Sequence, residues 1–284
     1  MGIIIILVFI IIMFCYYENN VFDITNINIK CNVNEKIRII HLSDLHSKQF
    51  GKNNNRLRKV IINEKPDIIF TTGDMIDSSL RNMDKIIDFL VEINKVIPVV
   101  YIPGNNEMRT EKIEEILEKL DDGKIIVLNN KIRELYLNKN KVYILGLAER
   151  RQDDGQMFYS KINSKYYYDN YKELFEKLEK KDGTKLVLSH YPENFEAVGE
   201  YSYNKYNFDI MFSGHAHGGQ FILPFIGGLF APGQGILPKY YRGVYGEKSK
   251  LIVSRGLGNS GFPLRLFNRP DLVVVDIISN NKIK

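Results

Sequence analysis

Short apolar runs rich in β-branched residues recur along this chain, and each of them ends in polar side chains. Five such runs cover residues 36–43, 67–74, 97–105, 184–190 and 208–215. Segments with helical periodicity, at 54–65, 82–95 and 111–123, separate or follow the first three runs. Runs of this length are typical of strands that are buried on both faces. Their alternation with helices predicts βαβ units around a buried sheet.

The remaining segments predict further strands and one more helix. An alternating stretch at 21–31 indicates a strand, and 131–147 indicates a hairpin that turns at Lys139 and Asn140. A tyrosine-rich helix is expected at 166–180, and two closing strands at 250–254 and 271–278. Since no linker-like stretch divides them, residues 21–284 are expected to form one α/β domain with a mixed sheet.

The first 17 residues carry no charged side chain, and Glu18 is the first to follow them. A membrane-spanning helix needs roughly 17–25 apolar residues, so this run is long enough. A cleaved signal peptide is the alternative, but the run has no basic start and no small-residue cleavage site. We therefore expect residues 1–20 to be a single membrane anchor, with 3–17 in the bilayer. The rest of the chain is expected to lie outside the cytoplasmic membrane.

Charge and cysteine content exclude some classes of protein. The net charge is +5, and the basic residues are mixed with acidic ones along the whole chain, so no nucleic-acid partner is expected. There are two cysteines, Cys15 and Cys31, without CxxC spacing. A disulfide framework and a cysteine-rich zinc site are therefore both disfavoured. The oligomeric state is left open by the sequence.

The polar residues at the strand ends have the chemistry of metal ligands. Each motif alone is ordinary turn chemistry, but strand ends in α/β sheets are also where ligands bind. Two carboxylates, four imidazoles and one amide suit manganese, iron or zinc better than calcium. They are too many for one four-coordinate ion, and they fit two metals. The seven candidate ligands are Asp44, His46, Asp74, Asn105, His190, His215 and His217.

These motifs resemble those of the calcineurin-like metallophosphoesterases. The matching stretches are HLSDLHS (41–47), TTGDMID (71–77), PGNNE (103–107), LSHYPE (188–193) and SGHAHGGQ (213–220). The stretch at 253–271 resembles a subgroup of small bacterial, membrane-associated phosphodiesterases. The resemblance implies a four-layer α/β/β/α sandwich of two mixed sheets with a dimetal site at one edge.

The resemblance also implies roles for the seven candidates. The first metal would be held by Asp44, His46 and His217, and the second by Asn105, His190 and His215. Asp74 would bridge the two metals, and a bridging hydroxide would be the nucleophile. Manganese is the first choice, with iron or zinc as alternatives. The resemblance thus assigns His215 and His217, which are separated by one residue, to different metals.

The sequence departs from the family in its third motif, where Asn106 stands in place of the usual histidine. That histidine is the suspected general acid, and an amide cannot deliver a proton at neutral pH. Asn106 is therefore expected to contact the phosphate, with Glu107 in a weak supporting role. General acid catalysis is typically worth about 10²–10⁴-fold, so turnover could be slow. The sequence therefore leaves two hypotheses for the function. The protein is either a hydrolase of phosphodiester or pyrophosphate bonds, or a metal-binding protein with weak or lost turnover.

Other residues and segments are weaker candidates for function. Lipid-linked phosphoesters are the first substrate expectation, with soluble nucleotides or envelope polymers as alternatives. His41 is expected to pack inside its strand. Arg265 and Arg269 are candidates for contacts with substrate anions, and ordinary surface arginines are the alternative. The apolar, glycine-rich segment at 221–246 is either a packed hairpin or a wall of the substrate site near the membrane.

Overall fold

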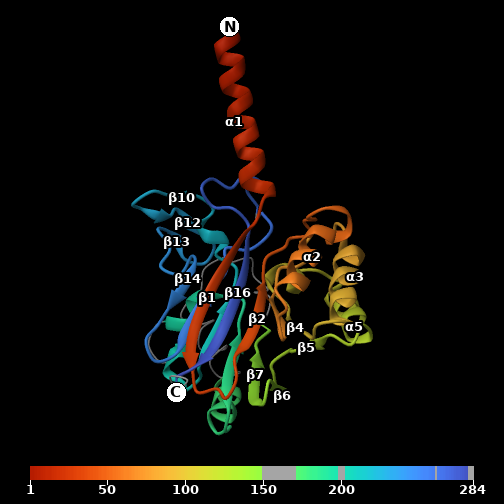
Figure 1. The fold of residues 1–284 in the computed structure, drawn as a ribbon, viewed down its shortest axis with the longest axis vertical. Helices are drawn as coiled ribbons and strands as arrows, with labels where there is room; N and C mark the ends of the chain where they lie inside the picture. The colour runs from red at the N-terminus through yellow and green to blue at the C-terminus, as the bar shows by residue number, and fades with distance from the viewer. Residues whose placement is uncertain (149–170, 198–201, 260, 281–284) are drawn as a thin grey trace.

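The computed structural model describes residues 1–148, 171–197, 202–259 and 261–280 (Figure 1). Two six-stranded sheets form its centre. The first sheet has the order β1 (Asp23–Cys31), β16 (Asp271–Ser279), β2 (Ile37–Leu42), β3 (Ile68–Thr72), β4 (Val99–Ile102), β5 (Ile126–Val127). The second has the order β14 (Gly243–Tyr245), β15 (Lys250–Val253), β9 (Ile210–Ser213), β8 (Thr184–Leu188), β7 (Asn140–Gly146), β6 (Lys131–Leu137).

Both sheets are mixed, as predicted. In the first sheet, β16 runs antiparallel to β2, whereas the other neighbouring strands are parallel. In the second sheet, the two edge pairs β14–β15 and β6–β7 are antiparallel, and the inner pairs are parallel. The carboxyl ends of the parallel inner strands therefore lie together at one edge of each sheet.

The two sheets pack face to face, and β2 shows why its sequence is apolar throughout. Ile37 and Ile39 face the second sheet, in a core that includes Phe212. Ile40 and Leu42 point to the opposite side, into a separate core. Successive strand residues face opposite sides, so a strand covered on both faces needs an unbroken apolar run.

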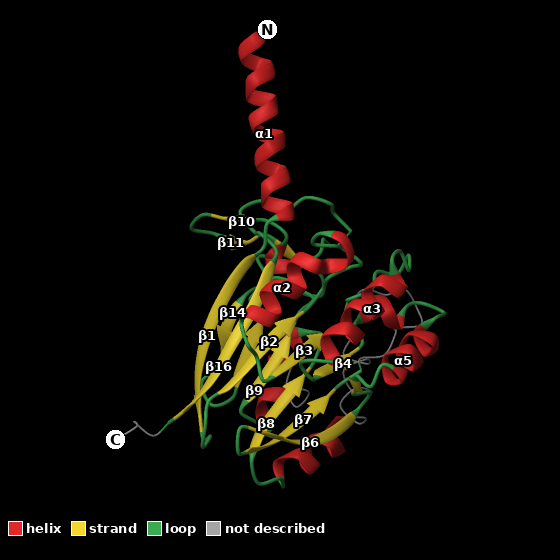
Figure 2. Cartoon of the chain, turned by 45° about the vertical axis from the view of Figure 1, so that its right-hand side comes forward, coloured by secondary structure: helices red, strands yellow, loops and turns green. Residues whose placement is uncertain are grey.

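Helices cover the two outer faces and complete four layers (Figure 2). The first sheet is covered by α2 (Asn55–Asn63), α3 (Met83–Asn94) and α5 (Ile113–Asp122). In α5, Ile116 and Leu120 are one turn apart and face the core. The second sheet is covered by a helix at 171–179 that buries Phe175 and Leu178. The predicted α/β/β/α sandwich is thus confirmed, although residues 166–170 of the last predicted helix lie outside the described residues.

The hairpin between β6 and β7 corrects one detail of the prediction. Leu137 pairs with Asn140, so the turn is formed by Asn138 and Lys139, one residue earlier than expected. Both turn residues have left-handed φ angles, of 45° and 60°. Asn140 is the first residue of β7, and its buried side chain binds the segment before β2. Its Oδ1 accepts a hydrogen bond from Asn34 N at 2.6 Å.

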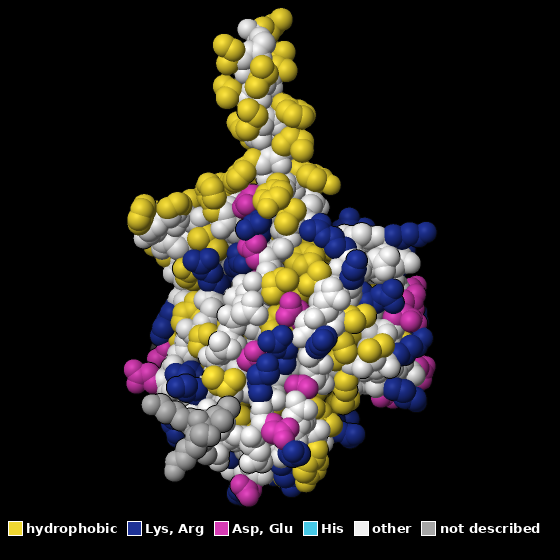
Figure 3. Space-filling view, viewed as in Figure 1, with side chains coloured by type: hydrophobic (Ala, Val, Ile, Leu, Met, Phe, Trp, Pro, Cys, Tyr) yellow, Lys and Arg dark blue, Asp and Glu magenta, His cyan; other side chains and the backbone are white. Residues whose placement is uncertain are grey.

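The N-terminal run forms one helix, α1 (Gly2–Asn20), which projects from the sandwich (Figures 1 and 3). Its apolar side chains are exposed, while Glu18 and Asn19 at its base are buried. Within the described part of the chain, α1 is the one helix long and apolar enough to cross a membrane. A signal sequence can be equally long and apolar.

Strand register places the ligand-bearing edge of the first sheet beside α1. β1 starts at Asp23, three residues after α1 ends, and Asp23 pairs with Asp271 at the start of β16. β16 runs antiparallel to β2, with Val273 opposite His41 near the carboxyl end of β2. The carboxyl end of β2 therefore lies at the end of the molecule from which α1 emerges.

Candidate metal centre

The seven predicted ligands converge where strands of both sheets end. Asp44 and His46 follow β2, Asp74 follows β3, and Asn105 begins the short helix α4 (Asn105–Met108) after β4. His190 follows β8, and the other two histidines follow β9. Each of the seven is at most 8% exposed.

Five of these residues have left-handed backbones, with φ between 46° and 63°: Asp44, His46, Asp74, His215 and His217. Each such non-glycine position costs about 1–3 kcal/mol and persists only where its surroundings fix it. Hydrogen bonds between the loops do this: the amide of Asp44 donates to Gly73 O at 3.0 Å, and that of His46 donates to Asp74 O at 2.9 Å. Such strain clusters at functional sites.

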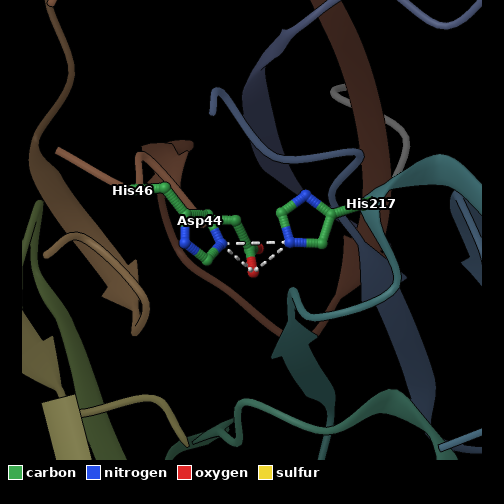
Figure 4. Close-up of side chains that lie close together, drawn as sticks. All are labelled: Asp44, His46 and His217. Atoms are coloured by element: carbon green, nitrogen blue, oxygen red, sulfur yellow. Dashed lines mark hydrogen bonds and ion pairs between the residues drawn. The ribbon is translucent and has the colours of Figure 1, made fainter. Parts of the chain in front are cut away.

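Asp44, His46 and His217 form one cluster of donor atoms (Figure 4). The Nε2 atoms of the two histidines are 3.1 Å apart. Asp44 Oδ1 lies 3.5 Å from His217 Nε2 and 4.0 Å from His46 Nε2. All three ligand atoms lie within 4.8 Å of one another, so one ion could contact them together.

Asp74, His190 and His215 form a second cluster of the same kind. His215 Nδ1 lies 3.2 Å from His190 Nε2. The side-chain oxygen of Asn105 lies 3.1 Å from the same His190 nitrogen, so the amide lies next to this cluster.

Asp74 lies between the two clusters. Its Oδ2 atom is 3.6 Å from His46 Nε2, in the first cluster, and 3.6 Å from His190 Nε2, in the second. A single carboxylate oxygen thus faces both sets of imidazoles. This is the position that a bridging ligand occupies in a two-metal site.

The protonation of the cluster fits divalent cations. Burial, and then the nearby basic side chains, hold the pKa of His215 and His217 well below the usual range, so both imidazoles are neutral at pH 7. Burial alone would raise the pKa of Asp74, but His190 and His46 outweigh it and keep the carboxyl ionised. Two imidazole nitrogens only 3.1 Å apart, those of His46 and His217, need a proton or a cation between them. These residues therefore fit a pair of metal ions.

Glu107 fixes two of the ligand loops. Its carboxylate is fully buried and accepts hydrogen bonds from the backbone amides of Asp74, Ile76 and Gly104, each at 2.9 Å. These bonds hold the end of β3 against the start of α4, and thus Asp74 beside Asn105. Sequence reasoning predicted only a weak supporting role for Glu107, because its contacts with these amides depend on tertiary structure.

Asn106 contacts Asp74 directly. Its backbone amide donates to Asp74 Oδ1 at 2.7 Å, and its side-chain amide donates to Oδ2. It also borders a cavity of about 690 Å³ above the two clusters. The amide is therefore close to the ligands and accessible from the cavity.

The cavity has a polar floor and one apolar wall. Its floor includes His46, Asp74 and His215, and its wall includes Phe230 and Phe262. Arg109 also borders the cavity, three residues after Asn106 and near the end of α4. Sequence reasoning missed Arg109, although its helical spacing from the asparagine pair was a usable signal.

The structure contradicts the predicted anion contacts of two arginines. Arg265 is completely buried, donates to Arg255 O at 2.8 Å, and has Nη2 3.3 Å from His217 Nδ1. Arg269 pairs with Asp23 at 2.7 Å and with Glu18 at 3.8 Å. Neither arginine borders the cavity, because backbone carbonyls hold the first and acidic groups at the base of α1 hold the second.

His41 packs inside the sandwich, as predicted. It is fully buried, its Nε2 lies 2.7 Å from Thr72 Oγ1, and its ring stands edge-on to Phe212. Among the described residues, it is the one histidine outside the two clusters.

Comparisons with known proteins agree with this geometry. Residues 37–219 match the family model described as calcineurin-like phosphoesterase. An uncharacterized metallophosphoesterase of Aquifex aeolicus is 30% identical over 251 residues, which cover 85% of each protein. Phosphodiesterase YaeI of Escherichia coli is 26% identical, covering 85% of this chain and 82% of YaeI. UDP-2,3-diacylglucosamine pyrophosphatase LpxG of Chlamydia muridarum is 23% identical, covering 84% of this chain and 83% of LpxG.

Proposed function

Because this chain belongs to the calcineurin-like phosphoesterases, which are hydrolases of phosphoric esters, we propose that it cleaves phosphodiester or pyrophosphate bonds at a membrane. Residues 21–284 would form the catalytic domain and residues 1–20 its anchor. The substrate would bind in the cavity above the two clusters, with its phosphate on the polar floor.

The observation that carries the proposal is the position of Asp74, whose Oδ2 is 3.6 Å from an imidazole of each cluster. We assign Asp44, His46 and His217 to one metal, Asn105, His190 and His215 to the other, and Asp74 to both. Two bound divalent cations would activate water and neutralise charge on the phosphoryl oxygens. Manganese is the preferred metal, with iron and zinc as alternatives, since mixed carboxylate and imidazole ligands suit all three.

A lipid-linked phosphoester is the proposed substrate class. The cavity is lined by Phe230 and Phe262 on its apolar wall and by the ligand clusters on its polar floor. It therefore offers one surface to a phosphate and another to an apolar group. The relative LpxG is named as a pyrophosphatase of UDP-2,3-diacylglucosamine, and this substrate name combines phosphate with acyl groups. Soluble diesters remain the alternative substrates.

A retained membrane anchor is supported by the contacts of its base. Asn19 Oδ1 accepts from the backbone amide of Arg265 at 3.0 Å, and Phe14 packs against Phe267 with ring centroids 5.8 Å apart. Residues that make such specific contacts with the folded domain are expected to remain in the mature protein. We propose that the domain lies outside the cytoplasmic membrane.

Arg109 is proposed to bind a phosphate oxygen. It borders the cavity together with Asn106 and carries the positive charge that Asn106 lacks. We expect Arg109→Gln to raise KM for bis-p-nitrophenyl phosphate by about ten- to a hundredfold, since a charged hydrogen bond is worth roughly 1.5–3 kcal/mol. Arg109→Lys, which keeps the charge, should recover part of the loss. An unchanged KM in Arg109→Gln would remove this residue from the substrate site.

The second candidate function is metal binding without turnover. It is favoured by one observation: the side-chain amide of Asn106 donates to Asp74, where the family pattern has a histidine able to protonate a leaving group. All seven ligands are nonetheless present, which favours an active enzyme over a decayed one.

A hydrolysis screen separates the two functions. Full-length protein in detergent would be stripped of metal, reloaded with manganese, and tested on bis-p-nitrophenyl phosphate, p-nitrophenyl phosphate and a lipid-linked nucleotide sugar. Metal-dependent turnover that Asp74→Asn abolishes, together with a loss of bound metal in that variant, is the expected result. Two tightly bound metals with no turnover of any substrate would favour the binding protein. Full activity in Asp74→Asn would overturn the assignment of the site.

A further inference from the structure

Exposed apolar side chains gather on two small hairpins next to the cavity. The hairpins are formed by β10 (Ile222–Leu223) with β11 (Gly227–Gly228) and by β12 (Phe230–Ala231) with β13 (Gly235–Ile236). Phe225 at the first tip is 109% exposed and Ile236 is 76% exposed. Single exposed apolar residues are common, but a group of them indicates an interaction surface. We call this group the apolar rim: Phe225, Ile226, Phe230, Ile236 and Leu237.

The apolar rim is joined to the base of α1 through one connecting segment. The amide of Ile222 donates to Leu266 O at 3.1 Å, and Phe221 packs against Phe262 at 5.6 Å between ring centroids. The same segment contacts α1 through Phe267, whose ring packs against Phe14. The hairpins, the segment at 262–267 and the helix are therefore in continuous contact.

The space-filling view shows the same continuity. In Figure 3, apolar side chains extend from α1 along the edge of the sandwich to the hairpins, which Figure 1 places beside the helix base. Charged residues cover much of the face below this edge. On this face, the apolar surface that continues from α1 thus lies at the end of the molecule where the helix emerges.

The position of Phe14 identifies the partner. Phe14 belongs to the uncharged run of α1, and it is in ring contact with Phe267, which is itself 53% exposed. A bilayer that covers α1 down to Phe14 must also reach Phe267 and, along the same edge, the hairpins. A protein partner would have to share this edge with the lipid around the helix.

We propose that the apolar rim inserts into the surface of the bilayer that holds α1. This inference rests on the membrane anchor of the proposed function and adds an orientation to it. Because Phe230 belongs both to the apolar rim and to the cavity wall, the cavity would open at the lipid surface. An amphiphilic phosphoester could then reach the polar floor while its apolar chains stay in the bilayer.

A depth measurement tests the insertion. Full-length Cys15→Ser protein, in which the remaining Cys31 is buried, would carry Phe225→Cys or Leu237→Cys with a polarity-sensitive fluorophore. The control is Tyr136→Cys, which is 70% exposed on β6, at the end of the molecule opposite α1 (Figure 1). In phosphatidylcholine–phosphatidylglycerol vesicles, lipids with a quencher near the glycerol should quench the two rim labels and leave the control unchanged. Rim labels as unquenched as the control would overturn the proposal, whether they lie in water or against protein.

A second experiment tests the consequence for substrate access. Phe225→Asp combined with Ile236→Asp should lower hydrolysis of a vesicle-embedded phosphoester about tenfold, because charge opposes insertion of the rim. Hydrolysis of bis-p-nitrophenyl phosphate in solution should stay within about twofold, since neither side chain borders the cavity. Equal activity of variant and wild type on the vesicle substrate would refute the access role. If wild type hydrolyses neither substrate, the hydrolase proposal fails, and the depth measurement still decides the insertion.

Discussion

At the residue scale, the chemistry of the site depends most on Asn106. Its two amide groups, backbone and side chain, both donate to Asp74, which lies between the clusters. These hydrogen bonds stabilise the ionised carboxylate but supply no proton to a leaving group. An ester whose leaving group is a stable anion needs no such proton, so the site should favour activated esters.

The substitution Asn106→His tests this dependence. It would place an imidazole at the cavity, and hydrolysis of alkyl phosphodiesters should rise by at most about 10²–10⁴-fold, the usual worth of a general acid. Hydrolysis of p-nitrophenyl esters should change little, because nitrophenolate leaves without protonation. The measurement is kcat/KM for both ester types, with Asn106→Gln as a control that keeps the amide. If wild type already cleaves both types equally well, another group supplies the proton.

His41 is expected to make stability depend on pH. Burial lowers its pKa from 6.5 to about 3, so the folded protein keeps it neutral where the unfolded chain protonates it. Its contribution to the free energy of unfolding is complete above pH 6.5 and is lost as the pH falls toward 3. The loss between pH 7 and pH 5 should be about 2 kcal/mol.

The variant His41→Gln isolates this effect. Glutamine can keep a hydrogen bond to Thr72 but does not titrate in this range. Denaturant unfolding of metal-free protein in detergent, at pH 7 and pH 5, should show the smaller pH dependence in the variant. Other titrating groups are common to both proteins and cancel in the difference. If the stability of the two proteins depends on pH in the same way, the pKa of His41 does not differ between the folded and unfolded states.

At the scale of elements, the turn after β9 shows how close the two sheets approach. A Cβ atom added to Gly214 would lie 1.9 Å from Ser43 Oγ and 2.2 Å from Asp44 Oδ2. The absence of a side chain here lets the turn that carries His215 and His217 reach the loop after β2. The histidine motif therefore needs this glycine for packing, apart from any ligand role.

Gly214→Ala should consequently disrupt the first cluster. The added methyl group must displace Asp44, and we expect the metal content of the purified protein to fall by about half or more, as one of two sites is distorted. Elemental analysis measures this, with Gly261→Ala as the control because a Cβ there meets no atom within 4 Å. Metal content equal to wild type in Gly214→Ala would mean that the loops can shift apart without cost.

The sequence was informative about elements whose signals are local. The apolar run of β2 and the motif after it predicted a buried strand and its ligands, because burial on both faces and the turn chemistry lie within ten residues. The burial of Arg265 had no such signal: its partners include Arg255 and His217, and their positions follow from how distant loops pack. The left-handed turn residue Asn138 was likewise not predicted. The position of this turn depends on Asn140, whose side chain bonds the distant residues Asn34 and Glu35.

At the scale of the whole molecule, α1 is attached to the domain by contacts that no local pattern predicts. These contacts include the hydrogen bond between Asn19 and Arg265, 246 residues apart, and the ion pair of Arg269 with Glu18. The sequence predicted the helix and its approximate end from the missing charges. It did not indicate that the helix base is packed on the domain, with its axis set by these contacts. Such packing makes the direction of the anchor a property of the fold.

Full-length protein should therefore stay in the membrane fraction through an alkaline carbonate wash. An arginine at the centre of a spanning helix costs about 2.5–3.5 kcal/mol, so Ile6→Arg combined with Ile10→Arg should move the protein to the soluble fraction. Ile62→Arg, an exposed position on α2, is the matched control and should leave the protein in the membrane. A shortened soluble form of wild type would instead identify α1 as a signal peptide. In that case the contacts of Asn19 would be absent from the mature protein, and the orientation inferred from them would fail as well.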